Sequence, residues 1–481
     1  IGRIESAKAS EVRDAARRWL SDGVFVLEIH PFPEHQASAA GADRSYRPEP
    51  GAPPQTSFPP LQRAKLPNGL EVILAERHAI PVVEMRLTLD AGFASDLHAV
   101  PGLAQLAMEM LDEGTRTRSS LQISDELLAL GAELRTGSDL DTSTVSLSAL
   151  KANLDASLRL YADVLLNPSF PEADLDRLKK QQLARIRAEK VQPFSMAIRV
   201  LPRLLFGAGH AYGTPFTGSG FESAVAGIAR EDLVRFHGAW FKPNHATLFV
   251  VGDTTLAEIR PKIEALFRDW KPGDVPKKNL RKVDHQPRPV VYVVDRPGSV
   301  QSVVVAGHLA PPRANQDEIA FEAINYLLGG TFTSRINMNL REDKHWTYGA
   351  GSFVVPASGQ RPFLAYTSVQ TDKTKETIQE IAKELRGPLG PRPLVADELQ
   401  QAKDGLTLTL PGTWETSRAV LASVEEMVRF GLPEDHFATY PARVRALDLA
   451  KLSEAAPKLL KPDHVVWLVV GDRAKIEASL A

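Results

Sequence analysis

The chain has 481 residues, of which 43% are hydrophobic and 24% are charged, so it can bury more than one hydrophobic core. Its formal net charge of -2 gives no reason to expect nucleic acid or an acidic membrane as a partner. No apolar run reaches the roughly 18 residues of a membrane-spanning helix, so we expect a soluble protein. The absence of cysteine excludes disulfides, thiolate zinc sites and cysteine nucleophiles.

The first predicted elements are a helix over residues 10–20 and a strand over residues 24–29. The chain begins at Ile1 without a basic and apolar leader, so we expect a processed, cloned or truncated N-terminus. Residues 31–62 contain eight prolines and no sustained periodicity, which predicts an extended tether. Residues 30–35 are rich in metal-ligating side chains, but two prolines exclude a helix there, and we expect no metal site.

The next segment predicts strands followed by helices. Strands are expected over residues 71–76 and 82–91, and a helix is expected to begin after Pro101. A second helix over residues 120–130, a strand pair at 133–135 and 142–148, and three helical segments between 153 and 206 follow. This order indicates an α+β fold, with helices layered on a mainly antiparallel sheet, rather than a doubly wound sheet.

An internal repeat divides the rest of the chain. Residues 240–253 end in Lys-Pro-Asn-His-Ala-Thr-Leu-Phe-Val-Val-Gly-Asp, and residues 459–472 end in Lys-Pro-Asp-His-Val-Val-Trp-Leu-Val-Val-Gly-Asp. Each copy follows an amphipathic helical stretch, so the repeat predicts two homologous halves of about 220 residues. Because His245 and His464 recur in the repeat, we expect them to have a structural role at the start of a strand, and we expect the remaining histidines to form no cluster.

The N-terminal helix and strand lie about one repeat length upstream of the first copy, so we interpret them as the end of a preceding half. The predicted segments are therefore a tail of that half at 1–30, a Pro-rich linker at 31–62, a first complete half at 63–275, a hinge at 276–287 and a second half at 288–481.

The helix after Pro101 carries the most informative motif. Residues 102–115 read Gly-Leu-Ala-Gln-Leu-Ala-Met-Glu-Met-Leu-Asp-Glu-Gly-Thr. This sequence resembles the zinc-binding helix of the pitrilysin family of metallopeptidases, with the pattern G-x-A-H-x-x-E-H-M-x-x-x-G-T. In that pattern two histidines bind zinc and the glutamate between them activates water. Here Gln105 and Glu109 replace the histidines, and Met108 replaces the glutamate.

The resemblance also identifies the position of the third zinc ligand. In the family this is a glutamate on a later helix, and the matching residue here is Arg185. A guanidinium group cannot ligate zinc and would repel it. We therefore expect no metal in this chain, and we predict an ion pair between Glu109 and Arg185 across the former metal site.

A different motif of the family is intact in the second half. Residues 334–342 read Ser-Arg-Ile-Asn-Met-Asn-Leu-Arg-Glu and are followed by Tyr348. The resemblance implies that Arg341 and Tyr348 reach the substrate at the zinc of an opposing catalytic half, where both could stabilise the developing negative charge of peptide hydrolysis. The alternative is that Arg341 only pairs with Glu342 or another acid and that Tyr348 packs at the start of a strand.

The resemblance implies a non-catalytic half of a two-part zinc peptidase, forming half of a clamshell, inactive alone and contributing Arg341 and Tyr348 to a partner. That partner would be a homologous subunit or upstream half carrying HxxEH and the zinc, and the substrate would be a peptide. The alternatives are a structural subunit similar to the core proteins of the respiratory cytochrome complex, or a module that binds peptides without cleavage. From the resemblance we expect the periplasm, with the cytoplasm as the alternative.

Overall fold

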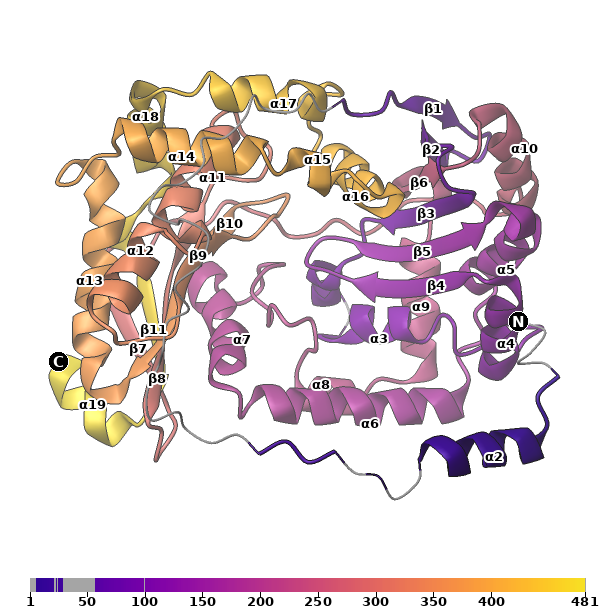
Figure 1. Ribbon diagram of the computed structural model, residues 1–481, viewed down its shortest axis with the longest axis horizontal. Coiled ribbons are helices and arrows are strands. Elements are labelled where there is room, and N and C mark those ends of the chain that lie inside the picture. Colours follow the sequence, from indigo (N-terminus) through magenta and orange to yellow (C-terminus); the bar gives the residue numbers. More distant parts are fainter. Residues whose placement is uncertain (1–5, 21–22, 24, 29–56, 99, 481) are drawn as a thin grey trace. The chain divides into compact units, whose positions relative to one another are not determined.

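The computed structural model describes residues 6–20, 23, 25–28, 57–98 and 100–480, which belong to two compact units, Ile1–Ala52 and Pro53–Ala481 (Figure 1). The first unit contains helix α2 (Ala9–Trp19), which confirms the predicted N-terminal helix. The predicted strand at 24–29 is wrong for its described residues, 25–28, because no sheet ladder includes them. Residues 30–35, which are rich in metal-ligating side chains, and most of the Pro-rich tether lie outside the described residues.

The first half of the second unit is built on a six-stranded sheet with the order β1-β2-β6-β3-β5-β4. Its strands are β1 (Gln62–Lys65), β2 (Glu71–Glu76), β3 (Val82–Leu89), β4 (Glu133–Ser138), β5 (Ser143–Leu150) and β6 (Ala246–Gly252). Its helices are α3 (Leu103–Glu109), α4 (Ser120–Leu130), α5 (Leu154–Leu166), α6 (Glu172–Glu189), α7 (Pro193–Phe206), α8 (Glu222–Ala226), α9 (Arg230–Trp240) and α10 (Leu256–Phe267).

The second half is built on a five-stranded sheet with the order β7-β11-β8-β10-β9. Its strands are β7 (Val290–Asp295), β8 (Gln301–Ala310), β9 (Ala350–Val354), β10 (Arg361–Gln370) and β11 (Val466–Gly471). Its helices are α11 (Glu318–Asn325), α12 (Arg335–Asn337), α13 (Thr374–Arg386), α14 (Ala396–Thr407), α15 (Leu410–Thr413), α16 (Ser417–Arg429), α17 (His436–Arg445), α18 (Leu449–Leu459) and α19 (Arg473–Leu480). Short 3₁₀ turns η1 (Phe93–His98), η2 (Lys151–Asn153), η3 (Pro243–His245), η6 (Thr371–Lys373), η7 (Gly387–Leu389) and η8 (Pro462–His464), and π turns η4 (Tyr326–Gly330) and η5 (Met338–Asp343), complete the elements.

The two sheets have the same connectivity once the additional edge strand β1 is set aside. In each half the first strand pairs in parallel with the last (β2 with β6, and β7 with β11), and every other pairing is antiparallel. The repeated sequence forms the same pair of elements twice, a 3₁₀ turn followed by the last strand. The structure thus confirms an α+β fold of two homologous halves.

The two halves exchange helices. Helix α7 of the first half packs against β8 and β11 of the second sheet, whereas α16 of the second half packs against β3 and β6 of the first (Figure 1). Each hydrophobic core therefore contains residues of both halves. Leu201 of α7 belongs to the same core as Val305 and Leu468 of the second sheet. Val424 of α16 belongs to the same core as Phe249 of the first sheet. Each sheet is therefore covered on one face by a helix from the other half.

Polar contacts also connect the halves. Glu425 of α16 accepts hydrogen bonds from Arg86 (2.5 Å) and Thr88 (2.9 Å) of β3. Asp141 accepts hydrogen bonds from the Tyr212 hydroxyl (2.6 Å) and from the Ser358 amide (2.8 Å) of the second half. The two acceptors, Glu425 and Asp141, are almost fully buried, so these contacts fix the arrangement of the halves. In the part of the chain that the structure describes, no helix is long and apolar enough to cross a bilayer.

Candidate functional site

Helix α3, which carries the altered zinc motif, is held in place at its start by Asp96. The Asp96 carboxylate accepts hydrogen bonds from the amides of Gly102 (2.7 Å) and Ala104 (2.8 Å), two of the free N–H groups of the first helical turn. Burial raises the pKa of Asp96 to about 7, against the opposing effect of these two bonds. Gly102 is required because its φ is +102° and a Cβ there would lie 2.7 Å from the Ser219 carbonyl oxygen.

The two positions that match the histidine ligands are joined to each other and to Arg185. The Gln105 amide donates to Glu109 Oε1 at 2.7 Å, and Arg185 donates to the same oxygen at 3.0 Å from helix α6. The predicted Glu109–Arg185 ion pair is therefore confirmed. The side chain of Glu109 is 20% exposed and that of Arg185 is 44% exposed, so the pair is partly open to solvent.

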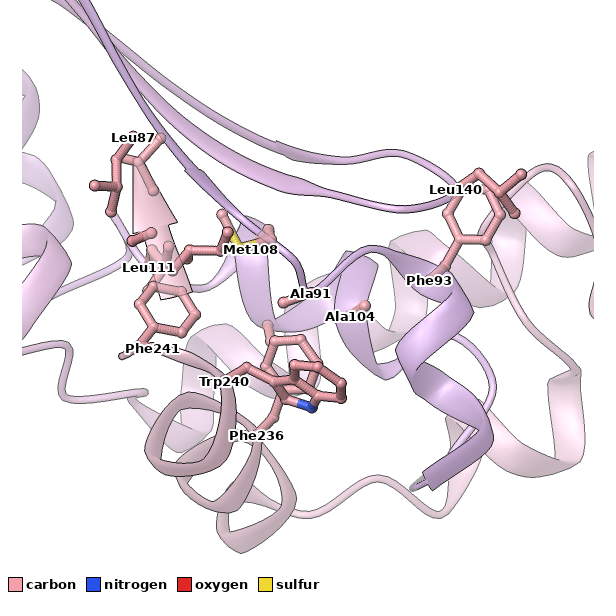
Figure 2. Packing of buried hydrophobic residues seen from close by; sticks show 14 of the residues in the cluster. Leu87, Ala91, Phe93, Ala104, Met108, Leu111, Leu140, Phe236, Trp240 and Phe241 are labelled. Carbon is pink, nitrogen blue, oxygen red and sulfur yellow. The ribbon is translucent and has the colours of Figure 1, made fainter. Parts of the chain in front are cut away.

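Met108, at the position of the catalytic glutamate, has become part of the hydrophobic core. It is completely buried, in the same apolar cluster as Leu87, Leu111 and Trp240 (Figure 2). Helix α3 packs here against α9 and β4. A thioether side chain suits such an irregular apolar space and has no group that could remove a proton from water.

The residues present do not fit a zinc ion. Zinc sites use three or four ligands drawn from histidine, cysteine and carboxylate groups, whereas here a single carboxylate is already bonded to an amide and a guanidinium group. Among the described residues, no group of three or more such side chains is placed to hold a metal.

More acids and arginines surround the Glu109–Arg185 pair. Glu113, just beyond α3, forms an ion pair with Arg177 of α6 at 2.5 Å. Asp112 is half-buried, and desolvation, with smaller effects of Glu113 and Glu109, raises its pKa to about 6. Helices α3 and α6 are thus connected by charge pairs along the face where the family motif places its metal.

In the second half, the structure brings Arg341 and Tyr348 to one site. Arg341 lies in the π turn η5, and the loop after it reverses at His345, whose φ is +57°. The amides of His345 and Trp346 donate to the carbonyl oxygens of Arg341 (3.1 Å) and Leu340 (3.0 Å), which closes the end of the turn. Arg341 and Tyr348 then border the same cavity of about 430 Å³.

Arg341 and Tyr348 differ in how firmly they are held. The Arg341 guanidinium group stacks on the Phe332 ring, with 4.5 Å from Cζ to the ring centroid, and its Nε lies 3.5 Å from Glu342. The predicted alternative of an Arg341–Glu342 pair is thus present, but as a long contact between half-exposed groups. Tyr348 does not pack at the start of a strand, because it is 90% exposed. Its hydroxyl has no hydrogen-bond partner among the described residues.

Two cavities border the exposed Tyr348. The polar one, described above, is lined by Gln301, Arg341, Glu342, His345, Trp346, Thr347, Tyr348 and Gln370. The second, of about 290 Å³, is more apolar and is lined by Phe194, Gln301, Val303, Thr347, Tyr348, Gly349, Tyr366, Thr367 and Ser368. The rings of Phe194 and Tyr366 lie 5.2 Å apart. Phe194 could not be predicted as a site residue, because it comes from α7 of the other half and reaches the site only through the exchange of helices.

Three histidines of the second half and the connecting segment lie near one another, although they form no group placed to hold a metal among the described residues. The rings of His285 and His464 lie 5.2 Å apart, and His464 Nδ1 is 2.5 Å from the Gln286 carbonyl oxygen. His308 is buried nearby and accepts a hydrogen bond from the Lys461 amide at 3.4 Å. These residues come from three distant segments, so only the fold brings them together. The structural role expected for His464 agrees with its bond to the connecting segment.

Comparison with known proteins identifies the family on both halves. Residues 71–207 match the family model described as insulinase, peptidase family M16, and residues 227–406 match the model of the peptidase M16 inactive domain. An uncharacterized zinc protease of Mycobacterium leprae is 22% identical over 332 residues, which cover 68% of this chain and 73% of that protein. A similar zinc protease of Rickettsia bellii is 21% identical over 328 residues, 67% of this chain and 77% of its own length.

Solved structures show the same fold. The structure of a peptidase M16 inactive domain from Pseudomonas fluorescens matches with a TM-score of 0.80 and 24% identity, covering 86% of this chain and 98% of that one. A protease from Helicobacter pylori matches with a TM-score of 0.78 and 19% identity, covering 86% and 99%. With both halves matched by models of one family, and with the fold that this family shares, the chain belongs to peptidase family M16, the pitrilysin family.

Proposed function

We propose that this chain is the non-catalytic half of a zinc metallopeptidase. In this proposal it encloses peptide substrates together with an HxxEH-bearing partner, and it contributes Arg341 and Tyr348 to the zinc site of that partner. The observation that carries the proposal is an asymmetry between the halves. In the first half the side chains at the former ligand positions bond to one another. In the second half an exposed tyrosine and an arginine border one cavity.

The first half lacks the groups for metal-assisted hydrolysis. Glu109 accepts hydrogen bonds from Gln105 and Arg185, and Met108 is completely buried in the core. Helix α3 therefore lacks both a set of zinc ligands and the base that activates water. In the proposal the zinc therefore belongs to the partner, and this chain holds none.

The second half has the groups expected of a substrate-binding wall. Attack on a peptide carbonyl builds negative charge on its oxygen, and donors such as a tyrosine hydroxyl or a guanidinium group stabilise that charge. The Tyr348 hydroxyl has no hydrogen-bond partner among the described residues and can donate to a substrate. The Arg341 guanidinium group stacks on Phe332 and lies near Glu342, and its other N–H groups can donate as well. Stacking on an aromatic ring restricts the arginine without using its N–H groups, which leaves them for the substrate.

The surroundings of Tyr348 suit a peptide. The cavity with Phe194 and Tyr366 offers aromatic surface to an apolar side chain, and the cavity with Gln301 and Gln370 offers amide groups to a peptide backbone. A scaffold subunit would need no exposed tyrosine that borders two such cavities.

The proposal is tested by Tyr348→Phe in the reconstituted pair of this chain and its HxxEH-bearing homologue. Loss of the hydroxyl should lower kcat for peptide cleavage by about 100-fold, the effect of removing one oxyanion donor, with little change in assembly. Tyr292→Phe is the matched control, because Tyr292 is an exposed tyrosine of β7 outside both cavities. Unchanged cleavage by the Tyr348 variant would favour a scaffold, and peptide affinity without cleavage by any pair would favour a binding module.

A further inference from the structure

A separate cavity of about 660 Å³ lies where the segment that connects the halves crosses the second half. It is lined by Leu280, Lys282, His285, Leu309, Ala310, Pro311, Pro312, Ser358, Gly359, Gln360, Lys458 and Lys461. The connecting segment is fixed here, since the Gln360 side chain bonds both the amide (2.6 Å) and the carbonyl oxygen (3.1 Å) of Val283. The cavity shares no residue with the two cavities around Tyr348.

The cavity has a surplus of positive charge. Lys458 is neutralised by Asp317 (2.8 Å) and Glu454 (3.0 Å). Lys461 donates to the Pro457 carbonyl oxygen at 2.6 Å and has no carboxylate partner among the described residues. Lys282 has neither a hydrogen-bond partner nor an ion-pair partner among the described residues. An ammonium group has three donors, so both lysines keep donors for a ligand.

The wall also contains His285, whose ring lies 5.2 Å from that of His464. The Nδ1 atom of His285 is buried and makes no hydrogen bond among the described residues. Burial lowers the pKa of His285, and the positive charges of Lys461, His464 and Lys282 lower it further against the opposing charge of Asp284. Both lysines line the same cavity as His285, and no carboxylate is among its described lining residues. Because a water-sized probe does not reach Nδ1, the imidazole lines the cavity through its other ring atoms.

The remaining wall is apolar. Leu309 and Ala310 are almost completely buried at the end of β8, and Pro311, Pro312 and Leu280 continue the surface. The backbone amides of Ser358 and Gly359 are already used by Asp141 and Tyr212, so they are not free to bind an anion. A small inorganic anion would leave this apolar wall uncovered, whereas an anion with an apolar body would cover it.

We propose that this cavity binds a carboxylate that carries an apolar chain. Lys282 and Lys461 provide the positive charge beside the His285 ring, and Leu280, Pro311 and Pro312 contact the apolar body. Such a carboxylate is present both in small free acids and at the C-terminus of a peptide with an apolar last residue.

Calorimetric titration of the full chain with N-acetyl-L-leucine tests the proposal, with N-acetyl-L-leucinamide as the uncharged comparison. The acid should bind at least about tenfold more tightly than the amide, because its charge-assisted hydrogen bonds are lost in the amide. Lys282→Gln should weaken binding of the acid by about fivefold to tenfold, a value discounted for the exposure of Lys282. Lys277→Gln is the matched control on the same segment and should change binding less than twofold.

Two further measurements complete the test. Binding of the acid should raise the pKa of His285, followed by NMR and assigned with His285→Gln, because a bound anion favours the charged imidazole. A short peptide ending in leucine that binds more tightly than N-acetyl-L-leucine identifies the peptide C-terminus as the source, and weaker binding identifies a small acid. Equal binding of acid and amide, or an unchanged affinity in the Lys282 variant, would overturn the proposal.

Discussion

Replacing Met108 with glutamate restores the residue type of the family motif and should destabilise the protein strongly. Met108 is completely buried in an apolar cluster, and the nearby carboxyl of Asp112 already has its pKa raised by burial from 3.8 to about 6. A rise in pKa of this size corresponds to about 3 kcal/mol of folding free energy that is lost when the buried carboxyl must ionise. With the loss of buried methionine surface, worth about 1.5–3 kcal/mol, we expect Met108→Glu to lower the free energy of unfolding by about 5 kcal/mol at pH 8.

Urea unfolding followed by tryptophan fluorescence measures this effect, since Trp240 belongs to the same cluster. Met108→Leu is the control and should cost less than about 1.5 kcal/mol, because it conserves volume and polarity. The pKa of the new carboxyl is raised in the folded state, so the folded state binds the proton more tightly, and the destabilisation should shrink as the pH falls from 8 towards 4. A loss below about 1 kcal/mol at pH 8, or one independent of pH, would refute the account of α3 as a core helix.

Three other predictions concern the same helix. A double-mutant cycle of Glu109→Gln and Arg185→Gln should give a coupling of only about 0.5 kcal/mol in urea unfolding, because Arg185 is 44% exposed; a coupling above about 2 kcal/mol would contradict this. Asp96 keeps its proton to about pH 7 in the folded state, so stability should fall as the pH rises from 4 to 7, and Asp96→Asn should flatten this dependence in thermal unfolding; an equal slope in both proteins would speak against it. Dialysis of the chain against zinc and elemental analysis should find well under one equivalent of bound metal, whereas a stoichiometric ion would overturn our interpretation of the Gln105, Glu109 and Arg185 positions.

Much of the fold could be predicted from local patterns. The helix predicted over residues 120–130 agrees with α4, and the strand predicted over residues 71–76 agrees with β2. Both segments have a clear hydrophobic pattern and clear boundary residues in the sequence. The repeat of the Lys-Pro-Asn/Asp-His segment correctly indicated two halves, since homologous sequences fold with the same connectivity. The Glu109–Arg185 pair was also predictable, because the family motif places both positions around one metal.

The features that could not be predicted depend on contacts between distant segments. Nothing in residues 193–206 or 417–429 shows that α7 and α16 cover the sheet of the opposite half, because an amphipathic helix does not specify which sheet it covers. For the same reason the meeting of His285, His308 and His464 was missed. The strand expected at 24–29 failed in its described residues because β propensity alone does not supply a neighbouring strand.

The most direct test of the proposed function is a titration of activity. The HxxEH-bearing homologue, sought in the coding sequence upstream of Ile1 and in neighbouring genes, is held at a fixed concentration while this chain is added, and peptide cleavage is measured. We predict negligible cleavage by either protein alone and activity that saturates at one chain per catalytic unit. Full activity of the homologue without this chain, or no gain on adding it, would contradict the proposal that the two halves form one active site.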